Sequence, residues 1–305
     1  MKSSLLFVAF IALLASSIAA QPCLLAAREV VPVMSSETKA TYEKKLAEAE
    51  AVHLEKPNEA DSIIWLGRRT AYLGNYKNAV RQFSSGIVLF PNDARFYRHR
   101  GHRYITLRCF DDAIKDFEKA AQLIKGKLDE VEPDGIPNAK NTPTSTLQSN
   151  IWYHLGLAYY LKGDFKKALT AYQEAQKVSK NNDMRVATTY WHYMTLRRIG
   201  KSREAKKLLE PYAAEIELIE NTDYLKLIKL NRNEAKAEDL LSTISGNAQT
   251  LGSASLGYGI GNYFLYNGDT EKALTVFRKI VAGNQWASFG YIAAEVELER
   301  QKPDR

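Results

Sequence analysis

Small and large apolar residues recur along this chain at constant intervals. Each set has a glycine, then a turn residue, an alanine and an aromatic residue: Gly67, Gly74, Ala79 and Phe83; Gly101, Arg108, Ala113 and Phe117; Gly156, Gly163, Ala168 and Tyr172; Gly261, Gly268, Ala273 and Phe277. Residue numbers rise by 34 from the first set to the second, and by 55 from the second to the third, which is one period plus an insertion of 21. A constant period of this length is typical of stacked helical hairpins.

The same pattern predicts how the two helices of each hairpin pack. A glycine has no side chain, so the second helix can approach the first closely, with the alanine as its small partner. A glycine inside a helix costs roughly 1 kcal/mol relative to alanine. Four glycines at one register therefore indicate a packing role, and we expect large aromatic side chains to fill the space around each contact.

These residues resemble the signature of the tetratricopeptide repeat (TPR), over residues 60–182 and 254–285. The resemblance implies an all-α fold, an α-solenoid of stacked TPR helical hairpins that ends in a capping helix. We expect one solenoid over residues 36–301, with repeats at about 60–93, 94–127, 149–182 and 186–219, a degenerate hairpin at 223–244, a repeat at 254–285 and the capping helix at 286–301.

Three further segments complete the expected layout. Residues 36–55 predict an amphipathic helix, because Tyr42, Leu46 and Ala49 share one face. Residues 126–147 contain three prolines and predict a loop inserted between repeats. Such a loop lies on one face of the stack, often the binding face, although a passive loop is the alternative. In the capping helix we expect Glu295, Glu297 and Glu299 to point outward.

The N-terminus has the layout of a secretory signal. Lys2 precedes an apolar run and small residues, so we expect cleavage after Ala19 or Ala20, with retention as an anchor as the alternative. Residues 21–35 then form a linker. Pro and Gln before Cys23 fit lipid attachment poorly. Cys23 and Cys109 lie far apart in the sequence, and we expect no disulfide framework from them. The chain is thus expected to be exported, either periplasmic or secreted.

Composition and motifs narrow the function. The net charge of +7 is spread evenly, which slightly favours an acidic or neutral partner and argues against nucleic acid. The glycine run at 257–261 lies inside a predicted helix and lacks the strand of a nucleotide site. His99 and His102 lack further zinc ligands at workable spacing. We expect no catalytic site, cofactor or metal.

The TPR resemblance also implies a ligand groove, because helix A positions line the concave face in that family. Carried onto this chain, these positions give the candidate groove residues Arg68, Tyr72, Arg95, Arg98, His102, Tyr153 and Tyr160. The groove would be basic at one end and aromatic at the other. Arginine binds carboxylates through a planar fork, so we expect a protein or peptide partner with an acidic or C-terminal segment. Arg68 and Arg98 are expected to be exposed, and an ordinary polar surface is the alternative.

The order of the segments is similar to a narrower family, the bacterial periplasmic TPR lipoproteins that act as adaptors for an envelope protease and for peptidoglycan hydrolases. The matching stretches are 190–196 with 204–209, and 261–269 with 273–277. This resemblance implies an exported scaffold or adaptor that binds its partner through the concave groove. The alternative is a cell-envelope component that binds peptidoglycan or another acidic polymer directly.

Overall fold

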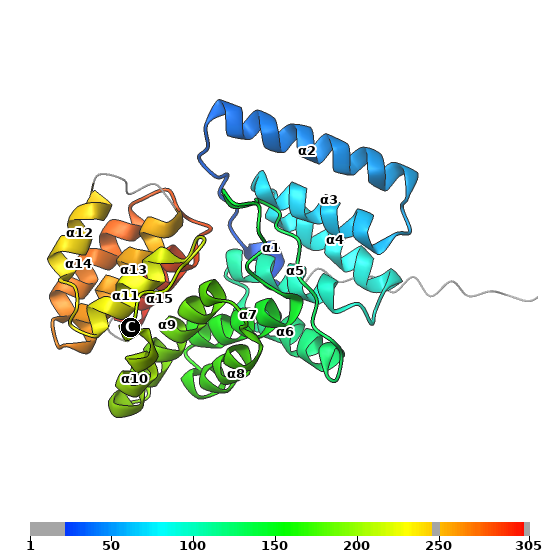
Figure 1. Cartoon of the computed structure of the whole chain (residues 1–305). Helices are drawn as coiled ribbons and strands as arrows, with labels where there is room; N and C mark the ends of the chain where they lie inside the picture. The colour runs from blue at the N-terminus through cyan, green and yellow to red at the C-terminus, as the bar shows by residue number, and fades with distance from the viewer. Residues whose placement is uncertain (1–21, 246–250, 302–305) are drawn as a thin grey trace, which may run out of the picture.

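The computed structural model describes residues 22–245 and 251–301, and the expected signal at 1–20 lies outside this part of the chain. The described residues form helices that pack in successive pairs (Figure 1). No helix among them is long and apolar enough to cross a membrane. In chain order the helices are α1 (Pro22–Ala26), α2 (Ser36–Glu55), α3 (Ala60–Tyr72), α4 (Tyr76–Leu89), α5 (Ala94–Thr106), α6 (Phe110–Ile124), α7 (Leu147–Lys162), α8 (Phe165–Val178), α9 (Asn182–Arg198), α10 (Ser202–Leu209), the 3-10 helix η1 (Glu210–Ala213), α11 (Thr222–Asn231), α12 (Ala237–Ser245), α13 (Leu251–Tyr266), α14 (Thr270–Val281) and α15 (Phe289–Arg300).

The predicted glycine contacts are confirmed in all four regular hairpins. A Cβ atom placed on each glycine would meet the aromatic ring of the second helix well inside van der Waals distance. The closest approaches are 2.4 Å from Gly67 to Phe83, 2.9 Å from Gly101 to Phe117, 2.8 Å from Gly156 to Tyr172 and 2.3 Å from Gly261 to Phe277. These aromatic side chains are fully buried. The period therefore records a helix-to-helix contact that is repeated along the stack.

The turn between the two helices of a hairpin also repeats, with one exception. Gly74, Gly163 and Gly268 have positive φ there, which glycine adopts without steric cost. The second hairpin has Arg108 at this position, with φ 64°. Its guanidinium donates to Glu295 at 2.8 Å and to the carbonyl of Trp286 at 3.0 Å. The arginine thus joins the second hairpin to the C-terminal segment.

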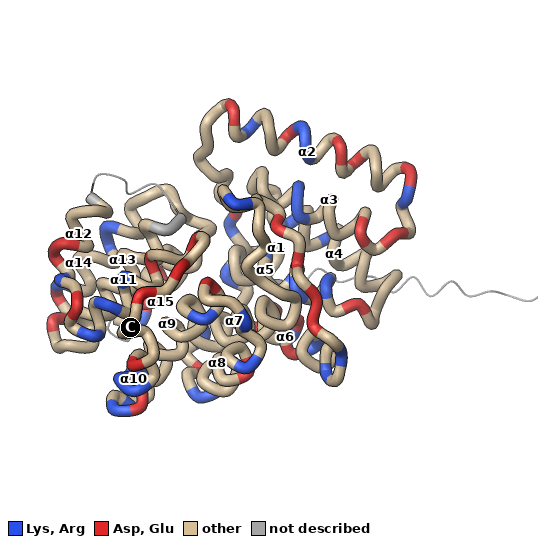
Figure 2. Tube along the Cα trace, in the orientation of Figure 1, with Lys and Arg blue, Asp and Glu red and all other residues tan. Residues whose placement is uncertain are grey.

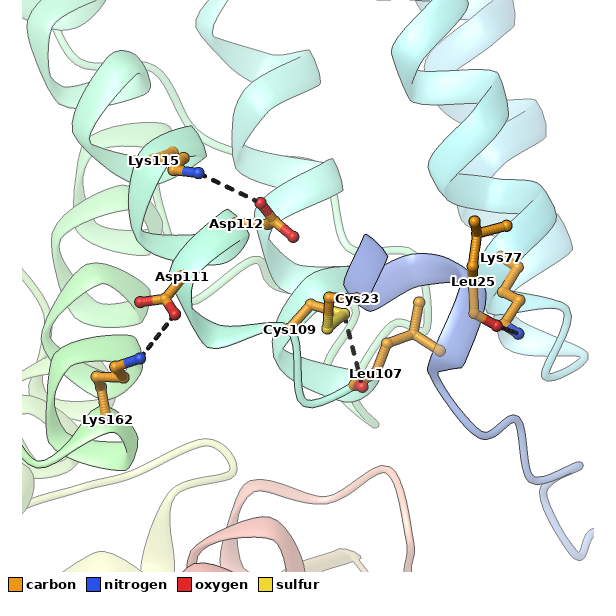
Figure 3. The surroundings of a disulfide bond; sticks show 9 residues. All are labelled: Cys23, Leu25, Lys77, Leu107, Cys109, Asp111, Asp112, Lys115 and Lys162. Atoms are coloured by element: carbon orange, nitrogen blue, oxygen red, sulfur yellow. Dashed lines mark hydrogen bonds and ion pairs between the residues drawn. A yellow bond between two sulfur atoms is a disulfide. The ribbon is translucent and has the colours of Figure 1, made fainter. Parts of the chain in front are cut away.

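The segment expected to be a linker is instead tied to the solenoid. It contains helix α1, and Cys23 of that helix forms a disulfide with Cys109 at the start of α6 (Figure 3). The expectation that the two cysteines do not pair is therefore wrong. That expectation was based on the separation of the two cysteines along the sequence. In the folded solenoid, the turn before α6 lies next to the N-terminal segment. Lys77 also donates to the carbonyl of Leu25 at 3.3 Å, which fixes α1 against α4.

The C-terminal helix does not end the stack as a free cap. Helix α15 packs on α13 and α14 and also contacts α7 in the middle of the chain. Glu297, expected to point outward, is 1% exposed and pairs with Arg198 and with Arg300, the latter at 2.7 Å. Arg300 in turn donates to the carbonyls of Tyr160 and Leu161 at 2.9 Å. The ion pair with Arg198 joins α15 to α9, and the hydrogen bonds of Arg300 join it to α7 in the third repeat.

The insertion at 126–147 folds back over the N-terminal hairpins. In Figure 1 the segment between α6 and α7 runs across α5 towards α3 and α2. Its two arms pair at the base, where the amide of Glu132 donates to Ser145 at 3.1 Å and that of Leu147 to Glu130 at 2.9 Å. The returning arm is anchored by Asn181, whose side chain donates to the carbonyl of Thr144 at 2.6 Å. The loop is thus a hairpin that is anchored at its base, and residues 132–135 face α3 and α5.

Candidate functional site

Two neighbouring first helices, α3 and α5, carry a cluster of positive side chains beneath the inserted loop. Arg68 and Arg69 come from the C-terminal half of α3, and Arg98 and Arg103 come from α5. The indole ring of Trp65 supports both α3 arginines, with the guanidinium carbons 4.3 Å and 4.7 Å from its centroid. The basic site is defined here as these four arginines together with Tyr72.

Residues 132–135 of the inserted loop, called the loop tip below, lie on this basic site. The carboxylate of Glu132 pairs with Arg98 at 2.8 Å. Arg68 donates to the carbonyl of Pro133 at 2.7 Å, and Arg69 donates to the carbonyl of Gly135 at 2.7 Å. Figure 2 shows the acidic residues of the loop in front of α5 and α3. Three arginines therefore hold one carboxylate and two main-chain carbonyls of a single short segment.

Burial changes the protonation of the groups beneath the loop. Burial lowers the pKa of Arg98, and Glu132 opposes this effect. Burial also lowers the pKa of Arg103, to about 10. The pKa values of His99 and His102 are held well below the usual range, by burial first and by the neighbouring arginines second. The histidines are therefore neutral near neutral pH, and the charge of the site comes from its arginines.

Polar groups at the site are not fully paired. A cavity of about 100 Å³ remains between the loop and the two helices, lined among others by Arg98, Arg103 and Glu132. The Nε atom of Arg98 and one carboxylate oxygen each of Glu132 and Asp134 are buried without a hydrogen-bond partner among the described residues. A buried polar atom left unpaired costs roughly 1–3 kcal/mol. The loop thus fits the basic site, but incompletely.

The expectation that Arg68 and Arg98 are exposed is wrong, since each is 8% exposed beneath the loop. Tyr72 lies at the same site, where the tip glycine Gly135 approaches its hydroxyl group. Arg95 does not join them. It pairs with Asp93 and with Asp61, both at 2.6 Å, and lines a hollow at the base of the loop.

The aromatic end of the expected groove is interior. Tyr153 is buried, and its hydroxyl group lies 3.1 Å from that of Tyr224 on α11. Tyr160 is fully buried and accepts a hydrogen bond from Tyr258 of α13 at 3.0 Å. His102 is covered by Phe289 of the C-terminal segment, with ring centroids 5.3 Å apart. The C-terminal hairpins thus fill the part of the concave face that the sequence assigns to a ligand.

Potential metal ligands do not gather at the basic site. His99 accepts a hydrogen bond from Arg98 at 3.1 Å, and its ring stacks on Phe83. In the described part of the chain, one grouping has metal-ligand spacing: Cys23, Cys109 and Asp112. Both of its sulfur atoms are in the disulfide and are not free thiolates. The structure therefore gives no reason to assign a metal or cofactor to either place.

Sequence reasoning missed Arg69, Arg103 and Glu132. A signal for the first two was present, because Arg69 and Arg103 differ by one full period and occupy the same place in successive repeats. For Glu132 the signal was the run of acidic residues from Asp129 to Asp134 in a chain whose nearby helices are rich in arginine. Opposite charge of this kind favours contact between two segments.

Comparisons with known proteins agree with the repeat architecture. The family model "Tetratricopeptide repeat" matches residues 149–182. A curated relative, small glutamine-rich tetratricopeptide repeat-containing protein 2 of Saccharomyces cerevisiae, is 20% identical over 162 residues. The match covers 51% of this chain and 41% of the relative, so the chain spans about two fifths of that protein.

Among solved structures, one chain of the APC/C hetero-tetramer Cut9-Hcn1 is similar to this chain. The TM-score is 0.51, with 12% identity, and the match covers 86% of this chain and 46% of that chain. A tetratricopeptide repeat protein from Parabacteroides merdae gives a TM-score of 0.48 and 13% identity over 86% of this chain and 94% of that chain.

Proposed function

We propose that this TPR solenoid is an exported scaffold that binds a protein partner, with the basic site on α3 and α5 as the binding surface. A TPR fold in itself suggests protein–protein interaction. The choice of surface rests on one observation: Arg68, Arg69 and Arg98 bind two main-chain carbonyls and one carboxylate of residues 132–135. The guanidinium groups of these arginines can donate to carbonyl and carboxylate oxygens of a partner in the same way.

Two features support export. Residues 1–20 read as a secretory signal. The disulfide between Cys23 and Cys109 is a bond that persists in oxidising compartments and is rare where thiols are kept reduced. The same bond occupies the sulfur that a lipid thioether would need, so we propose a protein without a lipid on Cys23. A chain that lacks residues 1–20 should keep both thiols reduced in cells, measured by thiol alkylation, whereas the full chain should not.

Crosslinking tests the binding surface. A photo-crosslinking phenylalanine analogue at Tyr72 keeps an aromatic ring in the basic site, and the same analogue at Val88, which is 68% exposed on α4, serves as control. After illumination in an envelope extract, we expect an adduct with another protein at Tyr72 and none at Val88. An adduct at Val88 alone, or at neither position, would overturn the assignment of this surface.

The alternative function, direct binding of peptidoglycan or another acidic polymer, is tested in parallel. Co-sedimentation of the purified protein with purified sacculi, without any protein adduct at Tyr72, would favour it. The geometry favours the protein partner, because the site holds a peptide backbone through its carbonyls rather than a row of exposed charges.

A further inference from the structure

The inserted loop presents an extended acidic segment to the basic site in the manner of a bound peptide. Glu132, Pro133 and Gly135 supply one carboxylate and two carbonyl groups to three arginines. The two carbonyls are main-chain groups that any polypeptide has. The side chain that distinguishes this segment from others is therefore the carboxylate of Glu132, which is 10% exposed beside Arg98.

The shape of the site adds a second requirement, for glycine at the tip. A Cβ atom on Gly135 would lie 1.6 Å from the hydroxyl oxygen of Tyr72 and 2.9 Å from Arg68. A residue with a side chain at this place could not adopt the observed pose unless Tyr72 moved. The site thus selects a carboxylate followed, at the third position after it, by a residue without a side chain.

Within the described part of the chain, the contact between the loop and the basic site leaves several polar atoms without hydrogen-bond partners. Arg98 keeps an unpaired Nε atom, and Glu132 and Asp134 each keep an unpaired carboxylate oxygen. Arg103 lines the cavity, and no carboxylate pairs with it among the described residues. A segment whose carboxylates pair with the Nε atom of Arg98 and with Arg103 would bind better than the loop. The main-chain pairing of Glu132 with Ser145 involves none of the three groups that the arginines hold, so the Glu132 side chain and residues 133–135 can leave the arginines while this pairing and the helices beneath stay folded.

We propose that residues 127–146 are an intramolecular occupant of the basic site, and that the partner uses an extended acidic segment of the same chemistry, which displaces the loop tip. The inference rests on the proposed function for the existence of a partner. The displacement of the tip by an acidic peptide is a property of this chain and is tested without that partner.

The experiment uses a fluorescent peptide with the sequence of residues 128–138 and measures its binding to the full chain by anisotropy. Two changes weaken the loop without altering the helices: Glu132→Gln and Gly135→Ala. Glu130→Gln is the matched control, since it removes the same charge from an exposed position of the same loop. If the loop occupies the site, the apparent affinity scales with the open fraction. Both weakened variants should therefore bind the peptide about tenfold more tightly than the wild type.

The control variant should bind like the wild type, and a peptide with glutamine in place of Glu132 should bind about tenfold more weakly to every protein. Equal affinity of all the protein variants, or no binding by any of them, would overturn the proposal. Binding of the glutamine peptide as tightly as the acidic one would overturn the stated partner chemistry.

The two proposals fail separately. Peptide binding without an adduct at Tyr72 in extract would leave this inference standing and remove the proposed function. An adduct at Tyr72 without displacement by the peptide would do the reverse.

Discussion

Replacing the packing glycines with alanine should rank the hairpins by how closely their helices approach. A Cβ atom would lie 2.3 Å from the Phe277 ring at Gly261 and 2.4 Å from the Phe83 ring at Gly67, but 2.9 Å from the nearest ring atom at Gly101. The first two distances require the ring to move, and both rings are buried. At Gly101 the Phe117 ring must also move, but by a smaller distance.

Two opposing contributions set the size of each effect. Alanine gains roughly 1 kcal/mol over glycine from helix propensity, while overpacking a filled core costs roughly 1–3 kcal/mol or more. We therefore expect Gly67→Ala and Gly261→Ala to lower the free energy of unfolding by about 2 kcal/mol, and Gly101→Ala to change it by less than about 1 kcal/mol. Urea unfolding followed by far-UV circular dichroism gives these values.

The reasoning also predicts a rescue. Phe83→Leu alone should destabilise the protein, because it leaves a cavity. Combined with Gly67→Ala it should cost less than the sum of the two single changes, by about 1–2 kcal/mol, since leucine leaves room for the new methyl group. Additive effects, or an increase in stability for Gly67→Ala, would refute the claim that this glycine exists to admit the ring.

Three further changes test other contacts. Cys23→Ser should lower the free energy of unfolding by roughly 2–4 kcal/mol, seen as a lower melting temperature that added reductant no longer changes; an unaltered melting temperature would contradict it. Burial, and then the nearby Arg98, lowers the pKa of His154 to about 3, so the unfolded chain binds a proton below about pH 6.5 that the folded chain does not. Stability should then fall from about pH 6.5 towards pH 3, by up to about 1.4 kcal/mol per pH unit for this histidine, and urea midpoints should vary less with pH in His154→Gln. Glu297→Gln should lower the free energy of unfolding by roughly 3 kcal/mol, because it leaves two arginines without their buried carboxylate. The exposed control Glu238→Gln should change it by no more than about 0.5 kcal/mol. Equal effects of the two changes on urea unfolding would contradict the buried pairing.

The repeating part of the fold could be predicted from the sequence because the contact that defines it is local and recurs. Gly67 and Phe83 belong to the two helices of one hairpin, and the same offset between glycine and aromatic residue appears again from Gly101, Gly156 and Gly261. The contacts that close the molecule occur once each. Arg300 reaches Tyr160, which lies in the third repeat far earlier in the chain, and no periodicity points to such a pair. The outward direction assigned to Glu297 failed for this reason.

For the candidate site, too, the features that follow from repeat position could be predicted, whereas those that depend on single contacts could not. Helical register alone predicted that Arg68 and Arg98 occupy neighbouring surfaces of successive first helices, and both contact the inserted loop. It could not show that the loop covers them, because the register of an inserted segment against another repeat depends on single contacts such as that between Arg69 and Gly135. The disulfide escaped for a related reason: the separation of Cys23 and Cys109 along the chain says nothing about their distance in a folded stack.

Both ends of the expected groove are filled by the chain itself, but with different chemistry, and under the proposed function this difference favours the basic end as the partner's site. At the aromatic end, Tyr160 and Tyr258 are buried among helices that belong to the main core, and opening it would expose large apolar surface. At the basic end the occupant is a loop tip held by three arginines, with polar atoms left unpaired. Water or an acidic ligand can replace those contacts at small cost. A partner that enters the concave face should therefore do so between α3, α5 and the loop.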